Sequence, residues 1–282
     1  MRKLIVLLLS MSLLLMGCRH DEYPVATPEL VVEGWIDNGR HPVVILTSTV
    51  PLTSEYQSVD SLENYVLKWA RVTISDGEHE EVMTGKYSED FFPPFIYTTS
   101  DMRGEVGHTY RLRVDYENFH AEAETTIPAP AAFDSLAWHQ VSSADTLFSI
   151  TGWLHDNPAT HDYYKLFTRL DREGGRRAFL SSYLGVFDDQ MLNNRKEVTV
   201  NKGRTNMEKD FTPYFAMGDT VIIKLAHVDS VAYDYWRSYE EMLSLSRNPL
   251  FPSKYNLRRN VRGALGGWFG YGATQYRVVV GE

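Results

Sequence analysis

Four potential metal ligands lie within eight residues near the middle of the chain. His155 and Asp156 are separated by four residues from His161 and Asp162. Imidazole nitrogens and carboxylate oxygens bind zinc or calcium at distances of about 2.0–2.6 Å. The intervening Asn157-Pro158 predicts a turn, and polar loops of this composition are common on protein surfaces. We therefore expect a polar loop between two strands, keep the four residues as candidate ligands, and assign no metal or other cofactor.

A glycine-rich segment with interleaved aromatic residues covers 263–272. A phosphate-binding loop needs a strand, a glycine loop and then a helix, usually with Lys and Ser or Thr, and this segment leads into a strand instead. The aromatic side chains of Trp268, Phe269 and Tyr271 could form a platform for a ligand. Buried packing is the other interpretation, and we favour it because such rings usually point inward. The glycines would then permit bulges and close backbone approach.

Adjacent carboxylates occur at Glu80-Glu81, Glu89-Asp90 and Asp188-Asp189. A glycosidase needs two carboxylates roughly 5–9.5 Å apart. Neighbours on a strand point to opposite faces, so no such pair is sufficient by itself. The sequence also has no Gly-x-Ser-x-Gly elbow and no His-Glu-x-x-His motif. We assign no catalytic residue and expect a protein that is not an enzyme.

The single cysteine, Cys18, stands where an apolar stretch meets an acidic segment. Residues 1–17 have a basic start, an apolar stretch and Gly17, the layout of a secretory signal, and the apolar stretch falls short of the roughly 20 residues of a transmembrane helix. Leu15-Met-Gly-Cys18 resembles the bacterial lipobox, whose cysteine is acylated and becomes the first mature residue. Several acyl chains, such as palmitate, on one residue give stable membrane attachment. We expect lipidation at Cys18; the alternative is an ordinary signal peptide with an incidental cysteine.

The residues after Cys18 favour delivery to the outer membrane. Arg19 stands where an aspartate would signal retention at the inner membrane. Asp21 and Glu22 are similar to the acidic export tag of surface-exposed lipoproteins, which favours the cell surface over a periplasm-facing position. A solvated linker that happens to be acidic is the alternative.

The composition excludes several classes of protein. The formal net charge is −9, and removal of Arg2 and Lys3 with the signal makes it −11. Nucleic-acid affinity depends on Lys and Arg side chains that neutralise phosphates, so we expect no nucleic-acid partner. Because Cys18 is the only cysteine, disulfides, cysteine-ligated zinc and a cysteine nucleophile are excluded from the rest of the chain.

Alternating and β-branched segments separated by turn residues predict a mainly β fold of two antiparallel β-sandwich-like domains. In the first half, strands are expected at 30–36, 42–47, 70–75, 81–84, 110–116 and 121–127. In the second half they are expected at 133–138, 147–153, 163–170, 177–184, 220–226 and 275–280. Helical spacing of apolar residues after Asp229-Ser230 predicts one packed helix near 229–247.

The composition break at Pro128–Ala131 marks the predicted domain boundary. The expected organisation is a lipoprotein signal peptide (1–17), an acylated tether (18–28), an immunoglobulin- or transthyretin-like β-sandwich (29–130), and a C-terminal β domain with the helix (131–282).

Five segments occur in the order typical of one family: "LVVEGWIDNGRHPVVILT" (30–47), "VTISDG" (72–77), "GHTYRLRV" (107–114), "TTIPAP" (125–130) and "NVRGALGGWFGYGA" (260–273). The chain resembles the domain-of-unknown-function 4249 family of bacterial envelope lipoproteins over nearly the whole mature length. The first and last segments are the most specific. The resemblance implies an outer-envelope lipoprotein, often encoded near TonB-dependent receptors, and it implies no catalytic residue.

Three functions follow as hypotheses. We expect a non-enzymatic lipid-anchored outer-membrane lipoprotein that assists a TonB-dependent uptake receptor or another envelope assembly, with the membrane and such a receptor as its partners. The alternative is a surface protein that binds carbohydrate or peptide through aromatic side chains. A hydrolase ranks below both.

Overall fold

The computed structural model describes residues 27–49, 63–142, 146–155, 157–192, 196–204, 210–245 and 257–281. Cys18, the expected signal peptide and most of the expected tether lie outside the described residues, as does Asp156. The observed structure is mainly β with several antiparallel sheets and a single helix in the described residues, which confirms the predicted fold class. That helix is not long and apolar enough to cross a membrane.

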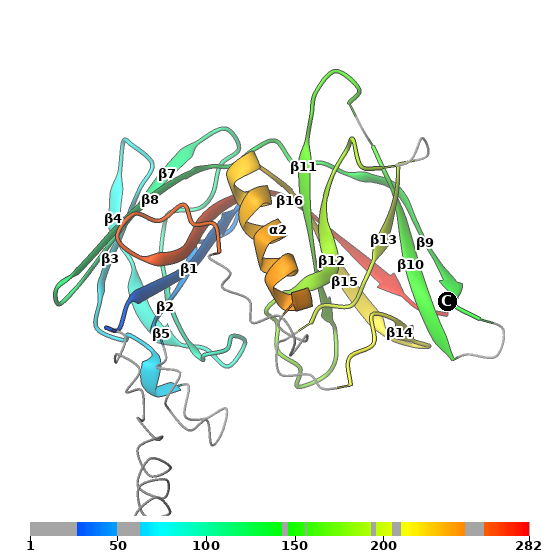
Figure 1. Ribbon diagram of the computed structural model, residues 1–282, viewed down its shortest axis with the longest axis horizontal. Coiled ribbons are helices and arrows are strands. Elements are labelled where there is room, and N and C mark those ends of the chain that lie inside the picture. The colour runs from blue at the N-terminus through cyan, green and yellow to red at the C-terminus, as the bar shows by residue number, and fades with distance from the viewer. Residues whose placement is uncertain are drawn as a thin grey trace, which may run out of the picture.

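An eight-stranded sheet, in the order β12-β11-β15-β16-β1-β2-β6-β5, runs through the whole molecule (Figure 1). Its strands are β1 (Leu30–Asp37), β2 (Val43–Ser48), β5 (Thr84–Tyr87), β6 (Phe95–Thr98), β11 (Tyr163–Leu170), β12 (Leu180–Asp188), β15 (Thr220–Val228) and β16 (Leu265–Val279). Neighbours in this sheet pair antiparallel, except that β1 and β16 pair parallel from Val31↔Leu265 to Asp37↔Tyr271.

Two four-stranded sheets complete the fold, and Figure 1 shows them at opposite ends of the molecule. One contains β3 (Arg71–Ser75), β4 (Glu80–Val82), β7 (Thr109–Tyr116) and β8 (Phe119–Thr126). The other contains β9 (Phe133–Gln140), β10 (Leu147–Leu154), β13 (Glu197–Val200) and β14 (Phe215–Ala216). Each small sheet encloses its own apolar core against part of the large sheet.

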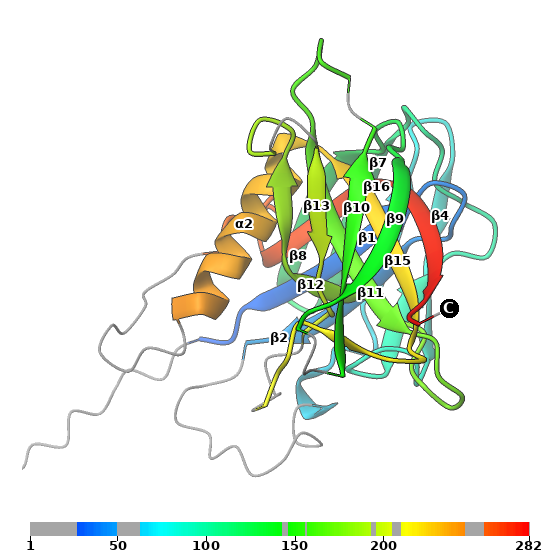
Figure 2. The same cartoon turned by 90° about the vertical axis from the view of Figure 1, so that its right-hand side faces the viewer.

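Side-chain alternation along β16 shows how one face of the large sheet contributes to both cores. Trp268 belongs to the first core, and Tyr276 and Val278 pack against the second, so one face of β16 contacts both. Phe269 and Tyr271 point to the opposite face and belong to a third cluster that includes α2 residues. Because successive side chains of a strand alternate between faces, the small sheets share one face of the large sheet and α2 covers the other (Figure 2).

The predicted division at residue 130 needs a correction. Two cores do lie on either side of this position, but the large sheet continues across it, and Val261, Ala264 and Trp268 belong to the first core. The C-terminal segment therefore completes the N-terminal sandwich. A sequence pattern could not show this, because parallel pairing of β1 with β16 joins residues that are more than 200 positions apart.

The helix α2 spans Ser230–Leu245, inside the predicted range 229–247. Asp229 caps it, because its Oδ1 accepts a hydrogen bond of 2.7 Å from the backbone N–H of Ala232. The helix packs against β11, β12 and β16, with Ala232 and Tyr233 buried against the sheet. Residues 246–256 lie outside the described part of the chain, so the expected end of the helix near residue 247 stays a prediction.

Two tryptophans provide a test of this packing. Trp268 is fully buried in the first core, whereas Trp69 is 90% exposed. We expect Trp268→Ala to lower the free energy of unfolding by about 3–5 kcal/mol, because it removes a large buried ring and leaves a cavity. Trp69→Ala should change it by no more than about 0.5 kcal/mol. Denaturant unfolding of both variants measures the difference, and equal effects would contradict the assigned core.

Candidate functional site

The face of the large sheet beneath α2 contains two buried lysines, Lys165 on β11 and Lys224 on β15. Removing a charged ammonium from water is unfavourable unless an opposite charge and hydrogen bonds compensate. Each lysine has such a partner, and in each case the partner comes from a different element of the fold. The two pairs therefore tie distant parts of the chain together.

Lys165 is paired with Glu240 of α2. Its Nζ donates to Glu240 Oε1 at 2.9 Å and to the carbonyl oxygen of Ser182 at 3.3 Å, and it lies 5.1 Å from the centroid of the Trp236 ring. Burial lowers the pKa of Lys165, while the Glu240 carboxylate opposes that decrease. Glu240 Oε1 also accepts the backbone N–H of Gly185 at 2.9 Å, so one carboxylate joins α2, β11 and β12.

Lys224 is paired with Asp37, the last residue of β1. Its Nζ lies 3.1 and 3.0 Å from the two carboxylate oxygens, and both side chains are buried. Phe167 and Tyr271 place their rings 4.6 and 4.9 Å from the same ammonium. Such contacts with aromatic faces stabilise a desolvated cation.

The aromatic side chains around the lysines form a closed layer between the sheet and the helix. Trp236 Nε1 donates to the hydroxyl of Tyr271 at 3.0 Å. Burial raises the pKa of Tyr271 well above its usual range, and burial likewise raises the pKa of Tyr235. The lysine amines are occupied by carboxylates and ring faces, so this cluster holds α2 on the sheet and presents no free amine for chemistry.

The aromatic side chains of the glycine-rich segment are buried, as the favoured interpretation expects, and they form no ligand platform. Trp268, Phe269 and Tyr271 are 0, 3 and 2% exposed, and they divide between two cores. Trp268 Nε1 donates to the carbonyl oxygen of Tyr110 at 3.0 Å, which fixes the ring inside the first sandwich. The alternation of a regular strand explains the result, because residues 268 and 269 must point to opposite faces of the sheet, and both faces are covered.

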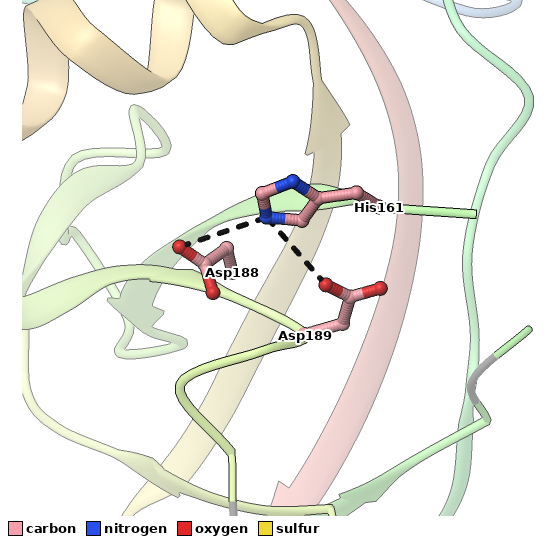
Figure 3. A group of neighbouring side chains, drawn as sticks. All are labelled: His161, Asp188 and Asp189. Carbon is pink, nitrogen blue, oxygen red and sulfur yellow. Dashed lines mark ion pairs between the residues drawn. The ribbon is translucent and has the colours of Figure 1, made fainter. Parts of the chain in front are cut away.

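A second polar cluster lies where β11 begins and β12 ends. His161 Nε2 is 3.9 Å from Asp188 Oδ2 and 3.8 Å from Asp189 Oδ1, and Figure 3 shows the imidazole facing both carboxylates. The three side chains offer donor atoms that all lie within 4.8 Å of one another. The side chain of His161 is 38% exposed, whereas those of Asp188 and Asp189 are 11 and 5% exposed. The cluster is therefore open to solvent on the histidine side.

The surrounding residues hold this cluster in place. Asp188 Oδ1 accepts the backbone N–H of Met191 at 2.8 Å, and its Oδ2 accepts the hydroxyl of Tyr233 at 3.1 Å. Burial raises the pKa of Tyr233, and the hydrogen bond and charge of Asp188 add to the increase. Asp189 Oδ2 accepts the backbone N–H of Asp162 at 3.2 Å, but the buried Oδ1 of Asp189 has no hydrogen-bond partner among the described residues.

The four candidate metal ligands predicted from the sequence do not form one site. His155 instead lies 2.9 Å from Asp134 Oδ1, and Asp156 lies outside the described residues. Asp162 accepts the Thr160 hydroxyl at 2.7 Å and lies 3.5 Å from His227. Of the three that the structure describes, only His161 joins the cluster with Asp188 and Asp189, which is a correction of the candidate set.

Sequence reasoning noticed Asp188-Asp189 as an acidic pair but did not connect it with His161. Neighbouring residues within a strand point to opposite faces, but β12 ends at Asp188 and Asp189 already belongs to the following turn. The two carboxylates can therefore face the same imidazole. The buried lysines were also missed. The sequence did contain one indication of them: Lys224 lies in the centre of the apolar strand Thr220–Val228, where an unpaired charge would be unfavourable.

A family model described as a domain of unknown function, DUF4249, matches residues 20–277. The chain belongs to the DUF4249 family. This match covers every described strand except the last residues of β16, which confirms the resemblance inferred from the sequence segments. No curated protein matches the chain.

Substitution of Glu240 tests the role of the buried pairs. We expect Glu240→Ala to lower the free energy of unfolding by about 3–5 kcal/mol, because it leaves the Lys165 ammonium buried without a counter-charge. The neighbouring Glu241, which forms an exposed pair with Arg237, provides the matched control, and Glu241→Ala should change stability by no more than about 0.5 kcal/mol.

A double variant separates the charge effect from lost packing. Lys165→Met combined with Glu240→Ala removes the uncompensated charge, so it should be more stable than Glu240→Ala alone in the same denaturant titration. A double variant no more stable than the single one would contradict the proposed role of the ion pair.

Proposed function

We propose that this DUF4249 protein is a non-enzymatic lipoprotein, anchored in the outer membrane through acyl chains on Cys18, that assists a TonB-dependent uptake receptor or another envelope assembly through protein contacts. The location is supported by the lipobox-like segment and by the start of the family match at residue 20, two residues after the expected first mature residue. The acidic residues Asp21 and Glu22 support a position on the cell surface.

The observation that carries the role in protein contacts is the exposure of Trp69. Its side chain is 90% exposed, although tryptophan is among the residues most enriched at the centre of protein interfaces. The backbone on both sides is fixed, because the buried Tyr97 hydroxyl donates to the carbonyl oxygen of Leu67 and accepts the N–H of Ala70. We therefore take this fixed, exposed ring as the candidate contact of the proposed interface.

The neighbouring sheet edge supports the same role. β5 (Thr84–Tyr87) is the last strand of the large sheet, all four of its residues are exposed, and Tyr87 is 65% exposed. β5 pairs with β6, the strand that carries Tyr97. An uncovered edge strand offers backbone N–H and C=O groups to which another chain can add.

The burial of Trp268, Phe269 and Tyr271 weighs against the alternative of a carbohydrate or peptide binder that uses these rings. A binder of this kind needs ring faces that a ligand can reach.

Affinity purification from detergent-solubilised envelopes tests the proposed role. We expect the wild-type protein to be recovered with a TonB-dependent receptor or another defined envelope complex, and Trp69→Ala to reduce this recovery because it removes the exposed ring. Met217→Ala serves as the control, since Met217 is 68% exposed and lies beside β14, at the other end of the molecule from Trp69. Recovery of the wild-type protein without any companion would contradict the role.

Fractionation of a Cys18→Ser variant tests the anchor independently. The variant should leave the membrane fraction because it has no thiol to acylate, whereas Trp69→Ala should remain there. A Cys18→Ser protein that is processed normally and stays in the membrane would contradict the proposed lipidation.

A further inference from the structure

We propose that His161, Asp188 and Asp189 bind a zinc ion through the imidazole Nε2 and one oxygen of each carboxylate. The inference concerns a corner of the fold that the proposed function does not use. It depends on the donor types, on their convergence, and on one buried oxygen that lacks a partner.

The unpartnered oxygen is the observation that points to a cation. The Asp189 side chain is only 5% exposed, and its Oδ2 already accepts the N–H of Asp162. Its Oδ1 has no hydrogen-bond partner in the described part of the chain and faces His161 Nε2 at 3.8 Å. A buried carboxylate oxygen without a donor is unfavourable, because it has lost its hydration and gained nothing in return. A bound cation supplies the missing interaction.

The second carboxylate makes the same cation more favourable. Asp188 is the chain neighbour of Asp189, and its Oδ2 lies 3.9 Å from the same imidazole nitrogen. Two carboxylates at the same corner repel each other when both are ionised, unless positive charge lies between them. The nearby hydroxyl of Tyr233 donates one hydrogen bond to Asp188 but carries no positive charge, and the ammonium of Lys196 donates to the backbone carbonyl oxygen of Asp189 at 2.9 Å.

The donor set and its spacing fit zinc. Imidazole with carboxylate oxygens is a common zinc environment, and a tetrahedral centre with bonds of about 2.1 Å separates its donors by about 3.4 Å. The two nitrogen-to-oxygen separations, 3.8 and 3.9 Å, are a few tenths of an ångström wider, and all three donor atoms lie within 4.8 Å of one another. His161 can close this difference, because it precedes β11 and its side chain is partly exposed.

A neighbouring tyrosine orients the imidazole of His161. The hydroxyl of Tyr163 lies 3.4 Å from His161 Nδ1, the ring nitrogen that does not face the carboxylates, and the two rings are 4.6 Å apart. A partner on the other nitrogen fixes the ring direction and leaves Nε2 free to bind metal. Three protein ligands leave a fourth position, on the exposed side of His161, for water or an external ligand.

Zinc binding to the full-length protein tests the site. The protein is purified with a tag that contains no histidine, treated with chelator, and titrated with ZnCl₂, with bound zinc and the thermal midpoint as readouts. We expect one zinc ion retained per chain and a higher midpoint, because the ion binds the folded state only. Asp189→Asn should lower the affinity by more than about 100-fold, beyond the effect of losing an outer-shell partner.

Asp189→Asn is also informative without metal. The amide oxygen can still accept the N–H of Asp162, while the amide nitrogen replaces the unpartnered oxygen and removes one negative charge. The metal-free variant should therefore be at least as stable as the metal-free wild type, yet should lose the response to zinc. A carboxylate with a purely structural role would give the opposite pattern: lower stability and an unchanged response.

Further variants cover the remaining outcomes. His161→Gln removes the nitrogen ligand at a partly exposed position and should also abolish the zinc response, which keeps the test valid if Asp189→Asn does not fold. His155→Gln is the matched control, because His155 forms an exposed pair with Asp134 and should bind as the wild type does. Zinc binding that survives both Asp189→Asn and His161→Gln, or no zinc binding by the wild type, would overturn the proposal.

Discussion

The fold depends on the packing of β16, because this strand must contact two cores and a helix at the same time. Its fifteen residues are long enough to lie beneath both small sheets. Between Trp268 of the first core and Tyr276 of the second, Gly270 and Gly272 occupy the same face of the strand. The chain that connects the two small sheets crosses at this point. A Cβ on Gly272 would lie 2.3 Å from the carbonyl oxygen of Pro128, and one on Gly270 would lie 2.8 Å from that of Thr126.

The crossing is fixed by hydrogen bonds as well as by close approach. The backbone N–H of Gly270 donates to Thr125 Oγ1 at 2.7 Å, and the hydroxyl of Thr274 donates to the carbonyl oxygen of Ala131 at 2.7 Å. Once this connection lies across β16, each small sheet has only one part of the large sheet to pack against. The two sandwiches are thus placed relative to each other by a shared strand and not by an independent interface.

The buried ion pairs act on the opposite face and specify geometry more than they add stability. Apolar residues of similar volume often replace a buried ion pair with little loss of stability. Here, however, Glu240 also binds the N–H of Gly185, directly after Leu184, whose backbone has a left-handed φ of 52°. The pairing of β11 with β12 shifts register between Lys165 and Phe167, opposite this irregular segment. The carboxylate therefore selects one arrangement of an irregular strand pair and positions α2 over it.

Sequence patterns predicted the hairpins and the helix, but they could not predict the pairing of strands that lie far apart in the chain. The hairpins β1–β2, β3–β4, β7–β8 and β11–β12 follow from alternation and turn residues, and the helix follows from its cap and its spacing. The parallel pair β1–β16 has no turn to signal it, so the C-terminal strand was assigned to the second domain alone. The glycines of β16 did indicate close backbone approach, but the sequence could not identify the segment 126–129 as what approaches them.

The candidate site could not be predicted from the sequence for the same reason, because its side chains come from the start of one strand and the end of the next. His161 precedes β11 and Asp188 closes β12, so the two residues meet only when the hairpin has formed. Asp188 also accepts the hydroxyl of Tyr233, in the first turn of α2. The helix is therefore fixed twice, by the Asp188 cluster at its start and by Glu240 further along. The Tyr233 hydroxyl thus links the cluster to the first turn of α2, whereas Glu240 links the later part of the helix to β11 and β12.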